Sequence, residues 1–438
     1  MSSNDYEQCQ KYFKKGLSKQ KERDFPAAES FYKRALRHNP MHLDANYLLG
    51  TLYAEQRDLG NALKFLLQAE AINPLSQMIQ NNLGNIYQMT RQFDKAIACY
   101  QRALSLEPNM PEVHNNLGNI YKNLEQFNEA EKCYRRALLL RPGFVEAYCN
   151  LGSVLGSQKR FQEAIESYRE ALNLSDAYKA AYEGLGVCYA ELGEREQAIA
   201  SFNRFLELDS GDNSEVKMQL AKLNAGAVPE RFPAAVMLRN YEKKAQNWDS
   251  DVQRPGMEFL GPKHVHEMLE KLGLPQARQL DVLDIGCGTG VCGEYLRAYA
   301  RRLEGVDLSP HMLEQAQKKG YYNKLECMEA VGFMQGCNRM FDLIVASGVL
   351  ILFGDLAPVF QAAGRLLNPG GNFVFTLYRS ESEAVAVRHN LHFAHSAAYV
   401  EETAQAANLQ VFLIEQHVHE YLSGEPQPGW VVTLRKAG

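Results

Sequence analysis

The sequence predicts two domains of different classes, an all-α solenoid followed by an α/β domain built on a parallel sheet. Three observations support this fold class. A 34-residue repeat fills the first half of the 438 residues, short apolar strands alternate with amphipathic helices in the second half, and a Pro-containing segment, AGAVPERFP, separates the two patterns. Fixed periods of about 20–50 residues are typical of solenoids. Alternation of strand and helix is typical of a parallel sheet covered by helices on both faces.

Composition and charge exclude several classes of protein. Apolar residues make up 46% and charged residues 23% of the chain, as in ordinary globular proteins. The net charge of −5 gives no reason to expect binding to nucleic acid or to an anionic membrane. The N-terminus is polar, and no apolar run reaches the roughly 18 residues that a membrane span needs. Nine scattered cysteines without a CxxC pair predict reduced thiols and a cytoplasmic location.

The glycines show the repeat most clearly. The stretch NNLGNIY occurs at residues 81–87 and again at 115–121. In this phase glycine recurs every 34 residues, at Gly16, Gly50, Gly84, Gly118, Gly152 and Gly186. Alanine follows each glycine after 12 residues, and a Tyr, Leu or Phe follows after 16. Small residues let two helices approach closely and the large residues fill the seam, so each unit is predicted to be an antiparallel helix pair that stacks on its neighbours.

This pattern resembles the tetratricopeptide repeat family over six copies, about residues 9–210. Proline closes the first four copies because it cannot continue the second helix of a pair. Residues 214–224 are predicted to form a capping helix. The first domain is therefore expected at residues 1–226, followed by a linker at 227–240 and a second domain at 241–438.

The resemblance implies a concave groove lined by the first helix of each repeat. Asn81 and Asn85 in the third copy, and Asn115 and Asn119 in the fourth, are expected to face it. A carboxamide both donates and accepts hydrogen bonds, so it can hold an extended backbone without reading its sequence. We therefore expect the groove to bind a protein or peptide. The alternative is that these asparagines are solvated surface residues, and the neighbouring copies lack the pair.

The second half changes period at about residue 280. Strands are predicted at 281–285, 303–307, 324–328, 341–347, 368–378, 409–421 and 429–436. Helices are predicted between them at 289–300, 309–320, 356–367 and 399–407. The last two strands, joined by SGEPQP, should form an antiparallel hairpin at the sheet edge.

One motif carries chemistry. DIGCGTG (284–290) ends the first strand, and its glycines allow a ligand to approach the backbone closely. Asp307 ends the second strand, where a carboxylate can accept hydrogen bonds from both hydroxyls of a ribose. A dinucleotide site of the GxGxxG type would need glycine where Val291 stands, so an oxidoreductase is disfavoured.

The segment resembles motif I of class I S-adenosylmethionine-dependent methyltransferases, and the rest of the second half follows that family in order. YEKKAQNWD (241–249) resembles its N-terminal lid, and LLNPGG (366–371) resembles the turn before its fifth strand. The resemblance implies a Rossmann-like methyltransferase domain and S-adenosylmethionine as cofactor. It implies cofactor contacts at Trp248, Asp284, Gly286, Cys287, Gly288, Asp307, Leu308, Glu329, Ala330 and Ser347.

Individual roles follow from the same resemblance. Asp284 should face the methionine end of the cofactor, Asp307 the ribose and Glu329 the adenine amino group. Glu329 departs from the usual Asp of the family, and its longer side chain can reach past the ring. Cys287 is interpreted as a small filler of the turn.

The sequence says less about the residues that would bind the methyl acceptor. Methyl transfer from a sulfonium leaves a neutral group, so a base is needed only for a protonated acceptor. His395, placed in a loop before a helix, and Tyr378, at the end of the fifth strand, are the candidate catalytic residues; a structural hydrogen bond is the alternative for each. No carboxylate or cysteine is expected to complete a ligand set with the pairs His264/His266 and His417/His419, so no metal site is expected.

Three functions remain open. The first is a methyltransferase whose repeats recruit a protein or peptide substrate or partner. The second is a small-molecule methyltransferase whose repeats serve assembly. The third is a scaffold that binds S-adenosylmethionine without catalysis, which the intact glycines and Asp307 disfavour. The sequence does not identify the acceptor atom or the oligomeric state.

Overall fold

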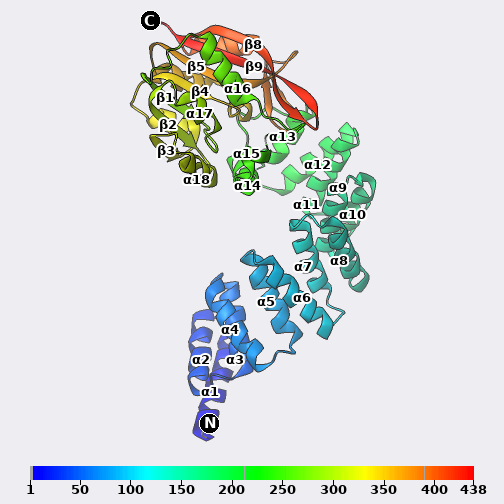
Figure 1. Cartoon of the computed structure of the whole chain (residues 1–438). Coiled ribbons are helices and arrows are strands. Elements are labelled where there is room, and N and C mark those ends of the chain that lie inside the picture. The colour runs from blue at the N-terminus through cyan, green and yellow to red at the C-terminus, as the bar shows by residue number, and fades with distance from the viewer. Residues whose placement is uncertain (1–2, 212, 252, 389) are drawn as a thin grey trace. The chain divides into compact units, whose positions relative to one another are not determined.

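The computed structural model describes residues 3–438 except 212, 252 and 389, and it divides into two compact units, residues 1–208 and 209–438 (Figure 1). The first unit is all-α and the second is built on a mostly parallel sheet, which confirms the predicted fold class. Among the described residues, no helix is both long enough and apolar enough to cross a membrane.

The first unit consists of six antiparallel helix pairs in chain order (Figure 1). The first three pairs are α1 (Ser3–Lys21) with α2 (Phe25–His38), α3 (Leu43–Glu55) with α4 (Leu59–Ile72), and α5 (Gln77–Met89) with α6 (Phe93–Leu106). The other three are α7 (Pro111–Asn123) with α8 (Phe127–Leu140), α9 (Val145–Ser157) with α10 (Phe161–Leu174), and α11 (Lys179–Glu191) with α12 (Arg195–Leu208).

The repeating glycine exists because an aromatic or leucine side chain of the second helix lies against it. A Cβ atom on Gly118 would lie 2.7 Å from the ring of Tyr134, which is fully buried. The same relation joins each of the other five repeat glycines to the residue 16 positions later. The period seen in the sequence is therefore the spacing of one packing contact repeated along the solenoid.

The segment between the repeats and the sheet is not a free linker, because it is hydrogen-bonded to and packed on the second unit. Helix α13 (Ser214–Lys222) belongs to the second compact unit and lies against strand β6 (Val385–Val387), whereas the sequence groups it with the repeats. The backbone of Phe232 donates to Leu352 O at 2.7 Å, and Gly354 donates to Glu230 O at 2.8 Å. Helix α14 (Ala234–Lys244) begins within the predicted linker, directly after Pro233. Proline is tolerated at the start of a helix because a backbone N–H there would have no partner within the helix.

The second unit contains one sheet in the order β3-β2-β1-β4-β5-β9-β8. Its parallel strands are β1 (Leu280–Ile285), β2 (Ala300–Asp307), β3 (Lys324–Cys327), β4 (Phe341–Ala346) and β5 (Leu367–Arg379). Strands β8 (Leu409–Leu422) and β9 (Glu425–Lys436) form the predicted antiparallel hairpin, with β9 beside β5. The carboxyl ends of β1, β2, β4 and β5 therefore lie at one edge, where ligands bind in such sheets.

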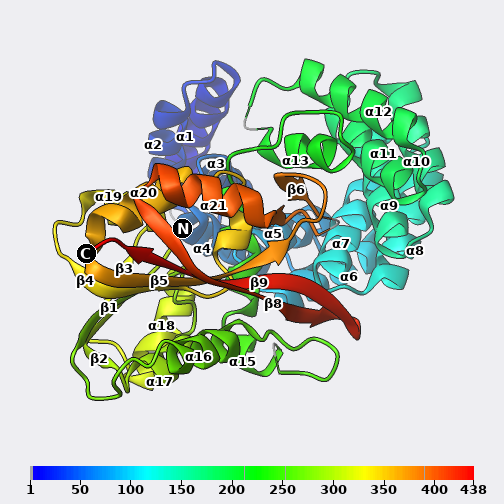
Figure 2. The ribbon, with the colours of Figure 1, turned by 90° about the horizontal axis from the view of Figure 1, so that it is seen from above.

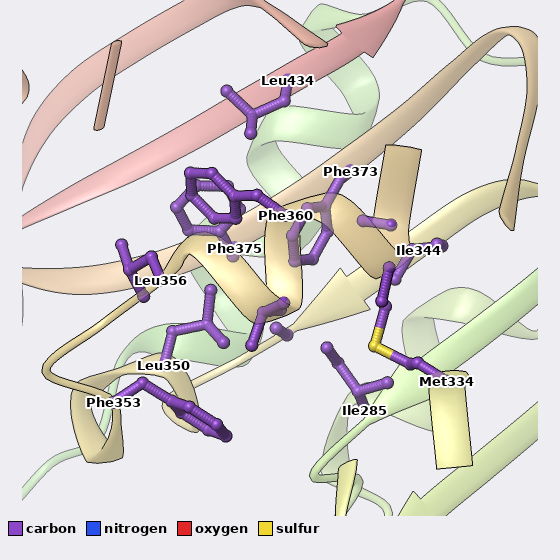
Figure 3. Close-up of a cluster of buried hydrophobic side chains, with 14 of the residues drawn as sticks. Ile285, Met334, Ile344, Leu350, Phe353, Leu356, Phe360, Phe373, Phe375 and Leu434 are labelled. Carbon is purple, nitrogen blue, oxygen red and sulfur yellow. The ribbon is translucent and has the colours of Figure 1, made fainter. Parts of the chain in front are cut away.

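Helices cover both faces of the sheet (Figure 2). One face packs against α19 (Ala330–Gly336), α20 (Ala357–Leu366) and α21 (Ala397–Ala406), and Figure 3 shows part of that core, with Phe360, Phe373 and Phe375 grouped together. The other face packs against α16 (Gly261–Lys271) and α17 (Val291–Leu296). Successive residues of β4 alternate between the two cores, because side chains of a strand point to opposite faces.

Several features of this unit differ from the sequence prediction, among them helix α16, which was not predicted. Helix α17 ends at Leu296 rather than at residue 300, because Ala300 already begins β2. Strands β6 and β7 (Phe393–His395) were not predicted; β7 pairs with the end of β5, and β6 pairs with β7. Helix α19 was also not predicted, since its seven residues are too few for a clear helical period.

Candidate functional site

The glycine-rich loop between β1 and α17 takes backbone conformations that favour glycine. Gly286, Gly288 and Gly290 have φ of 66°, 54° and 80°. A Cβ atom on Gly286 would lie 2.5 Å from Val349, whereas one on Gly288 would meet no atom within 4 Å. Gly288 therefore presents bare backbone toward open space, as close approach of a ligand requires. Cys287 is buried beneath the loop, and burial raises the pKa of its thiol well above the usual range, which fits the predicted filler role.

Asp307, at the carboxyl end of β2, is oriented by the same loop. Its Oδ2 accepts the backbone N–H of Gly288 at 2.9 Å, and its Oδ1 accepts that of Ser309 at 2.8 Å. Each oxygen keeps a second lone pair, so the carboxylate can still accept from two hydroxyl groups. Burial raises the pKa of Asp307, while these backbone hydrogen bonds oppose the rise. The residues thus fit a ribose placed over Gly288.

Asp284 lies at the end of β1 and is 1% exposed. Burial raises its pKa to about 7, and the hydroxyl of Tyr322, which donates to Oδ2 at 2.7 Å, opposes this rise. The Tyr322 ring also lies under the loop, within 2.9 Å of a Cβ placed on Gly290. A carboxyl that is half ionised near neutral pH will respond to a cationic group placed beside it.

Asp284 should make the stability of the cofactor-free second unit fall as pH rises. Its pKa is raised from 3.8 to about 7, so protons bind the folded state more tightly and the resulting stability is lost between about pH 4 and pH 7. Asp284→Asn should remove this part of the pH dependence, while the shifted pKa values of Asp307, Glu420, His395 and His419 keep their own contributions. Urea unfolding followed by tryptophan fluorescence measures this unit alone, because the two tryptophans, Trp248 and Trp430, both belong to it. An unchanged slope in the variant would contradict the assignment.

The segment before the sheet covers the loop. Asp249, in the short helix α15 (Trp248–Asp251), accepts a hydrogen bond from Thr289 Oγ1 at 2.5 Å and pairs with Lys319 Nζ at 2.5 Å. The ring of Trp248 meets that of Tyr241 edge-on, with centroids 5.3 Å apart. The Thr289 contact therefore holds this lid against the glycine-rich loop, the Lys319 contact holds it against helix α18 (Pro310–Lys319), and the aromatic pair lies within the lid.

Tyr241 connects the cofactor side of the site with a second group of polar residues. Burial, together with the nearby carboxylates of Asp307 and Glu420, raises the pKa of Tyr241 to about 12. Phe259 makes an isolated β-bridge with Glu420 and lies against Gly348 just beyond β4, where an added Cβ would be 2.5 Å from its ring. Glu420 of β8 therefore lies near the carboxyl edge of the sheet.

Glu420 and Tyr378 form the centre of that second group. The Tyr378 hydroxyl donates to Glu420 Oε1 and accepts from Asn390 Nδ2 at 3.2 Å. The guanidinium of Arg388 lies 4.5 Å from the centre of the Tyr378 ring, and the ring of His419 lies 4.6 Å from it. Burial raises the pKa of Glu420 and lowers that of His419 to about 3, so His419 is neutral. We call these five residues the acceptor cluster.

The other predicted cofactor residues lie just beyond β2, β3 and β4, and their surroundings differ. Glu329 caps α19, its carboxylate accepting the N–H groups of Val331 at 3.1 Å and Gly332 at 2.8 Å. Ala330 begins that helix and packs on the core. Leu308 follows Asp307 half-buried, and Ser347 follows β4 next to the start of α16. Because its oxygens already cap the helix, Glu329 can reach an adenine only by sharing them, and this role stays a prediction.

The predicted loop position of His395 is wrong. It ends β7, is fully buried, and its Nε2 lies 3.3 Å from Gly354 O. Burial lowers its pKa to about 4, so the ring is neutral at physiological pH. These contacts favour the structural alternative over a base that an acceptor could reach. The role of Tyr378 changes as well, since its hydroxyl is fixed by Glu420 rather than presented alone.

The four predicted partner-binding asparagines are partly engaged within the repeats. The Oδ1 atoms of Asn85 and Asn119 accept the hydroxyls of Tyr100 at 2.6 Å and Tyr134 at 2.7 Å. Asn115 is 7% exposed, and Asn81 Oδ1 is buried without a described partner. Bonding through oxygen leaves the amino groups of Asn85 and Asn119 as the donors available to a ligand.

Sequence reasoning missed three asparagines that join successive repeats. Asn82 donates to Tyr47, Asn116 to Asn85 and Asn150 to Asn115, each with its Nδ2 at 3.0–3.1 Å from the oxygen of the preceding repeat. These asparagines follow one another at intervals of 34 residues, and this spacing in the sequence could have predicted them. Tyr322 and Glu420 were missed too, because they reach the site only through long-range folding. Thr289 lies within the motif, but its contact with Asp249, 40 residues earlier, was not predicted.

A comparison with protein families agrees with this geometry. A family model described as a methyltransferase domain matches residues 258–424. The chain is 28% identical over 138 residues to the ubiquinone biosynthesis O-methyltransferase of Xanthomonas oryzae pv. oryzae, covering 30% of this chain and 56% of that protein. It is 23% identical over 167 residues to the malonyl-[acyl-carrier protein] O-methyltransferase of Acetivibrio thermocellus, covering 37% and 54%. The chain thus spans about half the length of these curated relatives.

The first unit matches tetratricopeptide repeat models between residues 13 and 210. Among solved structures, a crystal structure of the MamA protein is similar over 40% of this chain and 96% of its own, with 25% identity and a TM-score of 0.37. The predicted combination of tetratricopeptide repeats with a methyltransferase domain is confirmed.

Proposed function

Because this chain joins tetratricopeptide repeats to a methyltransferase domain, we propose that it transfers a methyl group from S-adenosylmethionine to an oxygen atom of a small acceptor. The single observation that carries the cofactor assignment is the pair formed by Gly288 and Asp307 at the sheet edge. The oxygen acceptor rests on the two relatives described above, both of which are named O-methyltransferases.

The chain's own residues fit the cofactor as follows. The backbone of Gly286 and Gly288 lies against it, Asp307 accepts from its ribose, and Asp284 faces its methionine end. Trp248 and Tyr241 of the lid exclude water, which strengthens the electrostatic contacts inside. When bound, S-adenosylmethionine supplies a methyl group on a positively charged sulfur.

Glu420 is the residue that we propose to act on the acceptor. A neutral hydroxyl needs a base at the moment its oxygen is methylated, and a carboxylate whose pKa is raised by burial is a stronger base than an exposed one. Tyr378 fixes the carboxylate through its hydroxyl. In this proposal Glu420 takes the hydroxyl proton and later returns it to solvent.

Glu420→Gln should lower kcat/KM by about 100-fold, since the amide keeps the size of the side chain but cannot take a proton. Cofactor affinity should stay within a factor of two or so, because Glu420 does not contact the glycine-rich loop. The matched control is Glu425→Gln, an exposed residue of the same hairpin, which should behave as wild type. Equal loss of activity in both variants would contradict a specific role.

Radiolabelled S-adenosylmethionine tests the proposed function. The pure whole chain is incubated with a lysate of the source organism, which is then separated into macromolecules and small metabolites. Label in the small-metabolite fraction, absent with Asp307→Ala, is the expected result. Label on protein would favour the second candidate below. An unlabelled lysate, with cofactor binding shown by calorimetry, would instead support a cofactor-binding scaffold.

The second candidate is methylation of a protein or peptide recruited by the repeats. It is favoured by the amino groups of Asn85 and Asn119, whose amides are oriented by tyrosine hydroxyls. Tetratricopeptide repeats generally bind proteins, so the same surface also fits a partner that is not methylated. We further propose a cytoplasmic location, on the basis of the scattered unpaired cysteines.

A further inference from the structure

Three side chains that could hold a metal ion meet where α16 packs on β8. His264 and Glu267 lie one turn apart on α16, and His417 lies on β8, with one ligand atom from each residue within 4.8 Å of the others. The rings of His264 and His417 have centroids 4.5 Å apart. The sequence prediction that no carboxylate completes these histidines is therefore wrong, because Glu267 follows His264 by the three residues that place both on one helix face.

Hydrogen bonding prepares the His264 ring to act as a ligand. Its Nε2 lies 2.7 Å from the backbone oxygen of Val418, which can only accept, so Nε2 carries a proton. In the neutral ring, Nδ1 then has a free electron pair, and this atom lies 3.4 Å from Glu267 Oε2. Ligand histidines commonly donate their other N–H to a backbone carbonyl in this way.

His417 is supported in a similar manner. Its Nε2 lies 3.1 Å from Glu415 Oε2, and Glu415 also pairs with Lys271 Nζ at 2.5 Å. A carboxylate behind a histidine fixes the orientation of its ring. On the outer side, Lys263 Nζ lies 3.9 Å from the other oxygen of Glu267, so one Glu267 oxygen faces a lysine and the other faces His264.

The donor set and spacing select the class of metal. Tetrahedral ligands with zinc bonds of about 2.0–2.1 Å stand about 3.3–3.5 Å apart, which the His264–Glu267 pair already satisfies. His417, the third ligand, reaches this spacing only after a side chain rotates. The side chains of Glu267 and His417 are 38% and 24% exposed, so they have room to do so. Two imidazoles and one carboxylate suit zinc, whereas magnesium and calcium prefer oxygen ligands alone.

We propose that His264, Glu267 and His417 bind a zinc ion, with water in the fourth position, and that the ion links α16 to β8. The site stands apart from the glycine-rich loop and does not depend on the proposed methyl transfer. It fixes β8 at His417, two residues before His419 and three before Glu420 of the acceptor cluster.

Calorimetric titration of zinc chloride into the whole, untagged, metal-free chain tests the site. We expect one zinc ion per chain and at least a 10-fold weaker affinity in His264→Ala, His417→Ala and Glu267→Gln, as for loss of a metal ligand or its support. His266→Ala and Glu270→Gln are matched controls on the same helix and should keep wild-type affinity. A hundredfold excess of zinc over Kd should raise the unfolding temperature reported by tryptophan fluorescence by roughly 5–10 °C.

Other outcomes overturn the proposal. Undetectable binding at about 1 mM zinc would leave only a close contact between His264 and Glu267, without a metal. Binding that survives His264→Ala, His417→Ala and Glu267→Gln alike would place the zinc elsewhere, and sulfur ligands in an X-ray absorption spectrum would assign it to the cysteines. His417→Ala and Glu267→Gln keep the test valid if the buried His264 is needed for folding.

Discussion

Asp307→Ala is expected to weaken the binding of S-adenosylmethionine by at least about 100-fold. The substitution removes the acceptor for the ribose hydroxyls, and hydrogen bonds to a charged group contribute about 1.5–3 kcal/mol each. It also removes the carboxylate that holds the N–H groups of Gly288 and Ser309, so the glycine-rich loop loses its orientation. Calorimetric titration of the cofactor into the whole chain measures the change.

Asp281→Asn is the matched control for this variant. Asp281 lies near the amino end of β1, the strand that pairs with the strand of Asp307, and it pairs with Arg301 at 2.7 Å and Arg302 at 3.2 Å. Its substitution should lower the stability slightly and leave cofactor affinity unchanged. If Asp307→Ala bound the cofactor as tightly as Asp281→Asn, the assignment of the ribose site would be wrong.

Gly118→Val is expected to destabilise the repeats by about 2–3 kcal/mol, the range for overpacking a filled core. Even the first added carbon would lie 2.7 Å from Tyr134, whose ring is buried between α7 and α8 and whose hydroxyl is bound to Asn119. The ring therefore has no free direction in which to move. Urea unfolding followed by far-UV circular dichroism should show the loss in the transition of the repeats.

Gly143→Val provides the comparison. Gly143 lies in the turn between α8 and α9, and a Cβ atom there would meet no other atom within 4 Å. Tryptophan fluorescence should be unaffected by either substitution, because both tryptophans lie in the other unit. Similar destabilisation by the two variants would show that the packing against Tyr134 is not what selects glycine.

The sequence predicted the features that depend on local periodicity. The glycine at Gly118 and the tyrosine 16 residues later belong to one helix pair, so their contact repeats at a fixed spacing and is visible in a single chain. The positions of Asp284 and Asp307 were predictable for a similar reason, since each ends a short apolar strand of a parallel sheet. The family matches support both predictions of domain type.

Features that depend on long-range contacts were not predicted. Glu420 meets Tyr378 only because β9 lies between β5 and β8, and nothing in either strand marks that meeting. His395 was assigned to a loop because three residues of β7 are too few to show an alternating pattern. Glu329 was expected at the adenine, and its competing role as a helix cap became visible only with α19.

The central claim is that S-adenosylmethionine binds across Gly288 and Asp307. A crystal structure of the whole chain with S-adenosylhomocysteine tests it most directly. The account predicts electron density for the ligand against the glycine-rich loop, with both ribose hydroxyls on the carboxylate of Asp307 and the lid of Trp248 and Tyr241 over it. Density for the ligand at another place in the second unit would contradict it. So would crystals in which the glycine-rich loop binds a nicotinamide dinucleotide but not S-adenosylhomocysteine.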